Sequence, residues 1–157
     1  MVYLEIAAEK GPPAELALPH GQGSYALLLQ LAERREMQIG RLGSWPLAAG
    51  YYLYLGSACG PGGLAARLRR HLSPEKRPFW HIDYLRPAAE VVAISYLVDP
   101  TRWEHRWAAA AAGLPEASIP VPRFGASDCR CPTHLLYFPQ QPTAASLISL
   151  LPIAASS

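Results

Sequence analysis

Two neighbouring stretches decide the fold of this chain: Tyr54-Leu55-Gly56-Ser57-Ala58 and Gly62-Gly63-Leu64-Ala65-Ala66-Arg67-Leu68-Arg69-Arg70-His71. The first belongs to an apolar, tyrosine-bearing segment that predicts a strand over residues 50–57, and the glycines after it predict a turn. The second predicts a helix over residues 63–72, because its leucines recur every four residues and form one apolar stripe. Arg67 and His71 are also four residues apart, so both project from one side of that helix.

Further apolar segments predict more strands and a second long helix. Residues 23–31 open with Gly23-Ser24-Tyr25 and continue as an apolar run typical of a buried strand, and residues 37–42 are expected to return as its hairpin partner. Strands are also expected over 91–98 and 133–138. The alanine-rich segment 101–112 predicts a helix, whereas residues 79–85 fit either a helix or an extended segment. This order of elements predicts an α+β fold with a small, mainly antiparallel sheet.

Length and composition predict one domain with extra terminal elements. The chain has 157 residues, of which half are apolar, enough for a single core. We expect an N-terminal arm over 1–22, the domain over 23–138 and a flexible tail over 139–157, which is rich in Ser, Ala, Pro and Gln. No run of about 18 uncharged apolar residues occurs, so no membrane span is expected. An odd cysteine count and an N-terminus unlike a signal peptide predict a cytoplasmic protein without disulfides.

Basic residues gather around the predicted helix 63–72, although the net charge is only +2. A local basic cluster binds phosphates by displacing counterions. The same residues also fit a solvated helix face, and their charge alone favours that simpler interpretation. The glycine-rich loop before the helix lacks the Gly-Lys-Ser/Thr ending of a P-loop, so it does not predict a nucleoside triphosphate site. The residues expected to contact nucleic acid are Arg69, Arg70, Lys76, Arg77 and His81.

Tyr25 and Tyr54 are the candidates for acid–base chemistry. On neighbouring strands in suitable register their phenols would meet across the sheet, although a lone tyrosine in a strand usually serves packing. A phenol has a pKa near 10, so it is a poor base unless a nearby cation lowers that pKa. Arg67 suits the charge that develops on a phosphate, and His71 suits substrate binding or proton relay. Together these residues favour cleavage of a phosphodiester bond.

Glu104 is the only acid inside the alanine-rich helix, and it has two interpretations. One carboxylate, completed by waters and a phosphate oxygen, is an ordinary Mg²⁺ arrangement. However, Thr101-Arg102-Trp103-Glu104 also fits a capping box, in which the glutamate only closes the start of the helix. Without further information the residues favour the cap.

Three metal-ligating residue types occur close together near the C-terminus. Cys129, Cys131 and His134 follow a Cys-x-Cys-x-x-His pattern, which is tighter than the usual Cys-x-x-Cys knuckle and lacks an evident second pair. The pattern leaves a structural Zn²⁺ site open, with Cys59 or His81 as the residue that would complete it. A cysteine nucleophile is less favoured, because no orienting third group is apparent.

Taken in order, these motifs resemble the GIY-YIG nuclease superfamily, and most closely the small Uri-superfamily endonuclease group. The resemblance spans about residues 20–138 and rests on six ordered pieces. These are Gly23-Ser24-Tyr25, Ile39-Gly40-Arg41-Leu42-Gly43, Gly50-Tyr51-Tyr52-Leu53-Tyr54-Leu55-Gly56-Ser57-Ala58, Arg67-Leu68-x-Arg70-His71, Trp80-His81-Ile82-Asp83-Tyr84-Leu85 and Phe124-Gly125-Ala126-Ser127-Asp128-Cys129-x-Cys131-x-x-His134-Leu135.

The resemblance implies a three-stranded antiparallel sheet flanked by helices and a one-metal cleavage of phosphodiester bonds. It places the family tyrosines on Tyr25 and Tyr54, the arginine on Arg67 and the helix histidine on His71. The metal glutamate falls on Glu104, which raises that interpretation above the cap. We therefore expect an endonuclease that uses Mg²⁺ or Mn²⁺ and cleaves branched or damaged DNA by structure rather than sequence. A nucleic-acid-binding module that does not cleave, and a zinc-stabilised interaction domain, are the alternatives.

Overall fold

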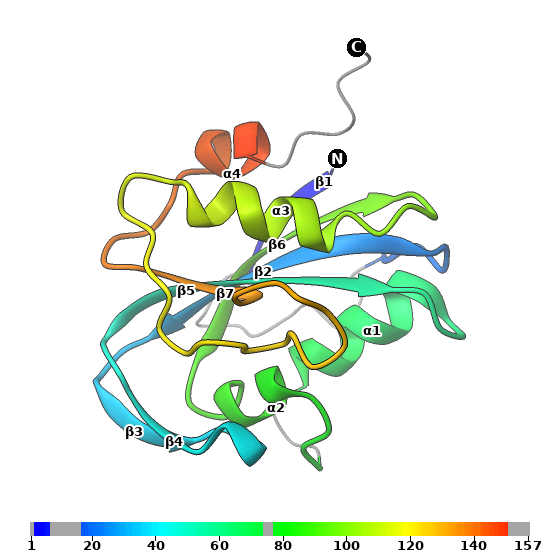
Figure 1. The fold of residues 1–157 in the computed structure, drawn as a ribbon. Helices are drawn as coiled ribbons and strands as arrows, with labels where there is room; N and C mark the ends of the chain where they lie inside the picture. The colour runs from blue at the N-terminus through cyan, green and yellow to red at the C-terminus, as the bar shows by residue number, and fades with distance from the viewer. Residues whose placement is uncertain (1, 7–16, 74–76, 151–157) are drawn as a thin grey trace.

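A five-stranded antiparallel sheet forms the centre of the molecule (Figure 1). The computed structural model describes residues 2–6, 17–73 and 77–150. In spatial order the strands are β1 (Val2–Glu5), β6 (Glu90–Val98), β2 (Gly23–Leu31), β5 (Gly50–Ala58) and β7 (Leu135–Phe138). The predicted α+β class and mainly antiparallel sheet are confirmed. The long strands β6, β2 and β5 form the expected three-stranded centre, and a short strand extends it at each edge.

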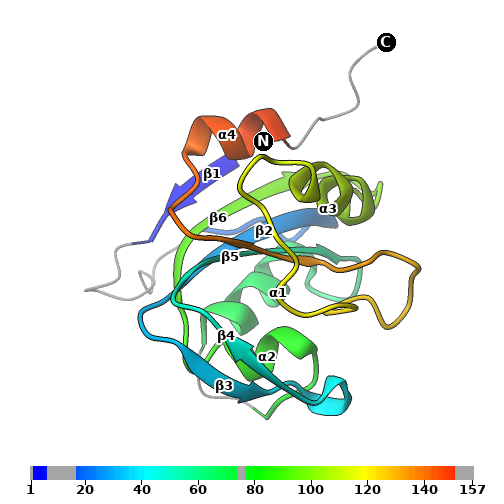
Figure 2. The same cartoon turned by 60° about the vertical axis from the view of Figure 1, so that its left-hand side comes forward.

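Helices cover both faces of this sheet (Figures 1 and 2). Helices α1 (Gly63–Leu72) and α2 (His81–Leu85) lie on one face, and α3 (Glu104–Ala112) and α4 (Ala144–Leu150) lie on the other. Because successive side chains of a strand point to opposite faces, β2 contributes to two separate cores. Its odd-numbered residues pack with α1 and α2, and its even-numbered residues pack with α3 and α4.

The segment between β2 and β5 forms a separate two-stranded hairpin. Strand β3 (Arg35–Gln38) pairs with β4 (Ser44–Leu47), and a 3₁₀ turn, η1 (Gly40–Leu42), joins them. The predicted hairpin between residues 23–31 and 37–42 is therefore wrong. Both edges of β2 are already occupied, by β5 and β6, so the returning chain has no free edge of β2 to pair with.

The two ends of the chain add structure to the predicted domain. β1 pairs with β6 in the segment expected to be an N-terminal arm. Within the segment 139–157, expected to be flexible, residues 144–150 form α4, and Leu147 of that helix is buried in the core beside α3. The remainder of that expected tail, residues 151–157, lies outside the described residues. None of the helices among the described residues is long and apolar enough to cross a membrane.

Candidate functional site

Tyr25, Tyr54 and His71 form a buried cluster between β2, β5 and α1. Tyr25 is opposite Gly56 and Tyr54 is opposite Leu27 in the β2–β5 register, so the two phenols share one face of the sheet. Their ring centroids are 6.4 Å apart, and the predicted meeting of the two tyrosines is confirmed. His71 lies in the last turn of α1, and its Nε2 is 2.6 Å from Tyr25 Oη in a buried hydrogen bond.

Burial keeps both phenols protonated. It raises the pKa of Tyr25 well above 10, and the neighbouring Tyr54 adds to that rise. It also raises the pKa of Tyr54. The Arg67 guanidinium opposes both rises without cancelling them, because a nearby positive charge favours the phenolate less strongly here than the loss of water disfavours it.

Arg67 reaches this cluster from one turn earlier on α1. Its Nη1 donates a hydrogen bond of 2.9 Å to the Ser57 carbonyl. Its guanidinium carbon lies 4.3 Å from the centroid of the Trp80 ring, a cation–π distance. Arg67 also lines a hollow of about 220 Å³ beside the glycine-rich loop, together with Gly60, Arg70 and Trp80. Half-buried Arg67 therefore lies between the buried tyrosines, whose pKa values it affects, and the hollow at the surface.

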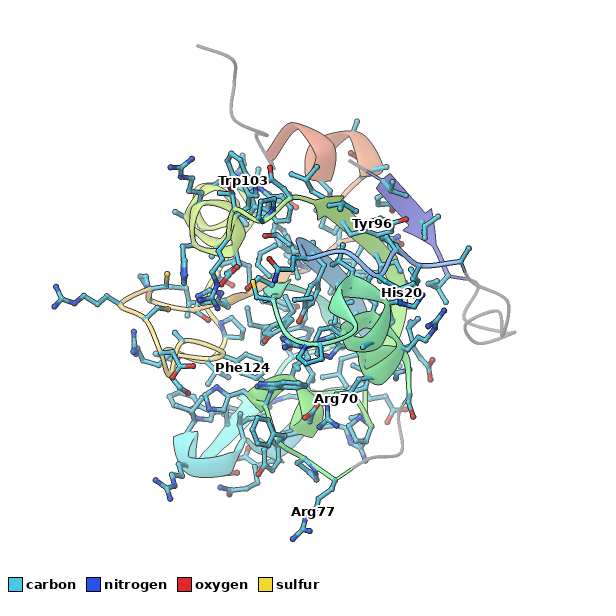
Figure 3. The ribbon with its side chains drawn as sticks, turned by 90° about the vertical axis from the view of Figure 1, so that its right-hand side faces the viewer. His20, Arg70, Arg77, Tyr96, Trp103 and Phe124 are labelled. Carbon is cyan, nitrogen blue, oxygen red and sulfur yellow. The ribbon has the colours of Figure 1, made fainter. Side chains whose placement is uncertain are left out.

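The basic residues of the predicted nucleic-acid surface differ in their surroundings. Arg70 Nη2 lies 2.8 Å from Oδ2 of the fully buried Asp83, so Arg70 ties α2 to α1. Its side chain is still partly exposed and lines the same hollow as Arg67. Arg69 and Arg77 are exposed, and Figure 3 shows Arg77 projecting away from the body of the molecule. Lys76 lies outside the described residues.

His81 faces a groove rather than the cysteines. The backbone N–H of Gly125 donates to His81 Nδ1 at 2.7 Å, which leaves the ring hydrogen on Nε2. Partial burial lowers the pKa of His81, so the ring is neutral near pH 7. The groove has a volume of about 700 Å³ and is also lined by Arg41, Phe79 and Arg123. The expectation that His81 would complete a zinc site is therefore wrong.

Glu104 opens helix α3 as a buried carboxylate, and the predicted capping box is absent. The residue before the helix is Trp103, and none of the side chains that the structure describes caps the helix. Glu104 is 5% exposed, and its Oε1 lies 3.5 Å from Arg102 Nε and from His105 Nε2. Its buried Oε2 has no hydrogen-bond partner among the described residues. A buried carboxylate oxygen in this state is a suitable ligand for a hard cation.

The negative charge of Glu104 acts on the tyrosine cluster. It contributes to the raised pKa of both Tyr25 and Tyr54, after the larger effect of burial. Tyr25, Tyr54 and His71 thus meet in one cluster that Arg67 also influences. The Glu104 carboxylate, at the start of α3, acts on this cluster through its charge.

Ser24, the middle residue of the Gly-Ser-Tyr motif, positions the start of α3. It is fully buried on the face of β2 opposite Tyr25, and its Oγ accepts a 2.9 Å hydrogen bond from the Trp103 N–H. Trp103 immediately precedes Glu104 (Figure 3 labels Trp103 at the start of α3). Strand β2 therefore carries Tyr25 on one face, and on the other face its Ser24 holds the backbone next to Glu104. The sequence analysis assigned Ser24 no role.

A second cluster joins the loop 121–134 to α3. Cys129, Cys131 and His134 meet His105, and one ligand atom from each lies within 4.8 Å of all the others. His105 was missed because nothing in its local sequence signals a ligand, and the fold alone brings it to the cysteines. Cys59 is exposed on another loop and takes no part. Burial raises the pKa of Cys131 to about 11, and the neighbouring Cys129 adds to this.

Arg86 is a further buried residue that the sequence analysis missed. It is 6% exposed and donates to three backbone carbonyls, of His71 at 2.8 Å, Leu72 at 3.0 Å and Ala89 at 2.9 Å. Two of these carbonyls are at the C-terminal end of α1, where a cation offsets the negative end of the helix dipole. Arg86 therefore fixes the turn of α1 that carries His71.

Comparison with protein families places most of the chain in a known family. A model of the family described as "Domain of unknown function DUF123" matches residues 24–153. No curated protein and no solved structure matches. The matched span begins inside β2 and continues past α4, so it includes both clusters. The chain therefore belongs to the DUF123 family of domains.

Proposed function

We propose that this protein is a GIY-YIG-type endonuclease that hydrolyses phosphodiester bonds in DNA with the help of Mg²⁺ or Mn²⁺. The 2.6 Å hydrogen bond between Tyr25 and His71 carries the proposal. It joins two separate motifs, at residues 23–25 and 67–71, in a buried site beside a second tyrosine and an arginine. Buried polar groups with strongly shifted pKa values concentrate at catalytic sites.

In this proposal Tyr25 and His71 together accept the proton of the attacking water. Because burial raises the pKa of Tyr25, a resting phenolate is disfavoured. Tyr25 Oη instead takes the water proton while it passes its own proton to His71 Nε2. The water oxygen bonds to phosphorus, and the leaving oxygen departs with the electron pair of the broken P–O bond. Such positioned proton transfer contributes about 10²- to 10⁴-fold to a rate.

Arg67 would stabilise the negative charge that develops on the phosphate. Its guanidinium offers five N–H donors in a plane, and the bond to the Ser57 carbonyl uses one of its terminal nitrogens. The stacked Trp80 ring restricts its orientation. A phosphate in the hollow lined by Arg67, Arg70 and the glycine-rich loop would meet this group.

Glu104 would hold the divalent cation. Its buried Oε2, without a hydrogen-bond partner among the described residues, fits a cation with a hard oxygen preference. A bound Mg²⁺ or Mn²⁺ would add positive charge next to the phosphate and favour the loss of the leaving oxygen. Proton transfer would be carried out by Tyr25 and His71, and the phosphate would be bound and oriented by Arg67.

The surface around the site favours recognition of DNA shape. Exposed Arg69 lies on α1, and exposed Arg77 lies in the segment between α1 and α2. Arg41 lines the groove beside His81. Contacts of this kind go to phosphates and carry no sequence information directly. We therefore expect cleavage that depends on DNA structure, as in branched or damaged duplexes.

The test is cleavage of labelled branched, linear duplex and single-stranded DNA in Mg²⁺ or Mn²⁺, with an RNA copy of each substrate. We expect the wild type to cut a branched DNA, and Tyr25→Phe and Glu104→Gln to cut it at least about 100-fold more slowly. The matched controls are Tyr52→Phe, which alters another buried phenol of the same sheet, and Glu116→Gln, which alters an exposed carboxylate after α3.

The outcomes separate the possible activities. Equal loss in the control variants, or full activity in both site variants, would overturn the assignment of the site. Binding of branched DNA without cleavage under every condition would replace the nuclease with a nucleic-acid-binding module of the same fold. Cleavage of the RNA copies alone would change the substrate and leave the site in place.

A further inference from the structure

We infer that His105, Cys129, Cys131 and His134 form a structural Zn²⁺ site that fastens the loop 121–134 to the first turn of α3. The four ligand atoms lie within 4.8 Å of one another. Cys129 Sγ is 3.3 Å from His134 Nε2, and Cys131 Sγ is 3.2 Å from His105 Nδ1. Edges of roughly 3.3–3.8 Å follow for a tetrahedron with Zn–S near 2.3 Å and Zn–N near 2.0 Å. Small side-chain shifts therefore convert this cluster into that tetrahedron.

The ring nitrogens of both histidines point the right way for metal binding. His134 Nδ1 lies 3.1 Å from the Leu55 carbonyl, which can only accept, so Nδ1 carries the hydrogen and Nε2 presents its lone pair to Cys129. His105 turns Nδ1 towards Cys131 and Nε2 towards the Glu104 carboxylate, at 3.5 Å. A carbonyl or carboxylate behind each ring is the usual outer shell of a zinc-bound histidine.

Arg123 organises the loop that supplies the cysteines. Its backbone is left-handed, with φ of 67°, a conformation that costs free energy for a residue other than glycine. Its guanidinium compensates by donating to the carbonyls of Ala126, Cys129 and Cys131 at 2.6–2.7 Å. The backbone carbonyls of both cysteine ligands are thus held by one side chain. The cysteines are positioned before any metal arrives.

The ligand set indicates zinc and a structural role. Two sulfurs and two imidazole nitrogens in tetrahedral arrangement suit Zn²⁺ better than Mg²⁺ or Ca²⁺, which prefer oxygen. Four protein ligands close the coordination sphere and leave no position for a reacting water. This metal is therefore distinct from the cation proposed at Glu104. The same loop packs Phe124 against Tyr54, with ring centroids 6.0 Å apart. By fixing this loop, the zinc ion would also hold Tyr54 in place.

The test is the metal content of the purified wild-type chain. We expect about one zinc ion per chain by mass spectrometry of the metal, and two sulfur and two nitrogen neighbours by X-ray absorption. Replacement by Co²⁺ should give the intense visible absorption of a tetrahedral thiolate site. Cys131→Ser and His105→Gln should lose most of the zinc, whereas Cys59→Ser, which alters the exposed cysteine of another loop, should keep it.

Glu104→Gln separates this inference from the proposed function. It should slow Mg²⁺-dependent cleavage at least about 100-fold and still bind one zinc ion, because residue 104 is not a zinc ligand and the glutamine amide oxygen can still accept a hydrogen bond from His105 Nε2. Wild-type protein that binds neither zinc nor cobalt, or that shows an octahedral cobalt spectrum, would overturn the inference. Retention of zinc by His105→Gln, with a cobalt spectrum unchanged from the wild type, would also overturn it. The cobalt spectrum of the wild type decides the question even if a ligand variant does not fold.

Discussion

Gly56 lies directly opposite Tyr25 in the β2–β5 pair, and a Cβ on Gly56 would come within 2.5 Å of Tyr25 Oη. The tyrosine of one motif therefore lies across the glycine of the other. This contact explains the glycine at this position of a strand rich in tyrosine and leucine, since only a residue without a side chain leaves room for the ring. The phenol reaches His71 through that space.

Gly56→Ala should displace Tyr25 and break its hydrogen bond to His71. We expect a loss of about 2 kcal/mol in the free energy of unfolding, since overpacking of a core typically costs about 1–3 kcal/mol. If the proposed nuclease activity is correct, cleavage should fall at least about 10-fold. Urea unfolding followed by circular dichroism measures the first effect. Gly60→Ala is the control, because a Cβ there would meet nothing within 4 Å, and equal stability of both variants would contradict the packing role of Gly56.

The raised pKa values of Tyr25 and Tyr54 predict unfolding in alkali. The unfolded phenols ionise near pH 10, whereas burial holds the folded pKa values higher. The contribution of these groups to stability is therefore complete below pH 10 and falls as the pH rises above it. Tyr25→Phe removes one of these phenols, so its free energy of unfolding should fall less between pH 8 and the alkaline range than that of the wild type. For a given stability at pH 8, the variant should therefore unfold at a higher pH. Circular dichroism against pH measures the midpoint, and an unchanged midpoint would show that Tyr25 ionises freely in the folded protein.

The sequence predicted the parts of the fold that depend on local pattern. Strand 23–31 and helix 63–72 occur as expected, because apolar runs and a leucine stripe determine them within a single element. The position of residues 35–47 did not follow, because the choice of partner strand depends on which edges of β2 are already taken. In the same way, Thr101-Arg102-Trp103-Glu104 has the spacing of a capping box, yet Ser24 on a distant strand holds the chain so that the helix starts at Glu104.

In the candidate sites too, residues in local motifs were predicted and residues that depend on distant partners were missed. The two tyrosines were predicted to meet because their motifs lie on strands that pair, and the register brings them together. The loop residues Cys129, Cys131 and His134 were visible as a short pattern. His105 and Arg86 were not, because each works through residues far away in the chain, and single residues without a local motif carry no signal of such partners.

Arg86→Met should destabilise the fold strongly. The substitution keeps much of the apolar length of the side chain but leaves three carbonyls without their donor, two of them at the end of α1. A buried polar group that loses its hydrogen-bond partner lowers the free energy of unfolding by about 1–3 kcal/mol. We expect a total loss of about 3 kcal/mol for the three carbonyls, because water can reach some of them in the variant. Urea unfolding measures the change. Arg34→Met, at an exposed arginine, should change stability by less than about 0.5 kcal/mol, and a similar small effect for Arg86→Met would show that the carbonyls are solvated.

Asp83 makes stability depend on pH in the acid range. Burial alone would raise its pKa, but the backbone N–H groups of Trp80 and Phe79 and the Arg70 guanidinium outweigh burial and lower it. The ionised carboxylate therefore stabilises the fold above the unfolded pKa of about 4, and this stabilisation is lost as the pH falls through the lower folded pKa. Asp83→Asn should cost about 2 kcal/mol at pH 7 and should flatten the acid side of the stability curve. Asp128→Asn, at an exposed carboxylate, should keep the wild-type acid slope, and a slope that survives in Asp83→Asn would assign acid unfolding to another group.

Ser24→Ala should loosen the start of α3 without removing any proposed catalytic group. The variant loses the 2.9 Å hydrogen bond to the Trp103 N–H, which places the first turn of the helix and so the Glu104 carboxylate. We expect a loss of about 1 kcal/mol in the free energy of unfolding, as for other side chains that hold helix starts. On the proposed function, the Mg²⁺ concentration for half-maximal cleavage should rise several-fold while the maximal rate at saturating Mg²⁺ changes little. Ser44→Ala, at an exposed serine of β4, is the control, and a lower maximal rate with unchanged Mg²⁺ dependence would place Ser24 in the chemistry itself instead of behind the metal ligand.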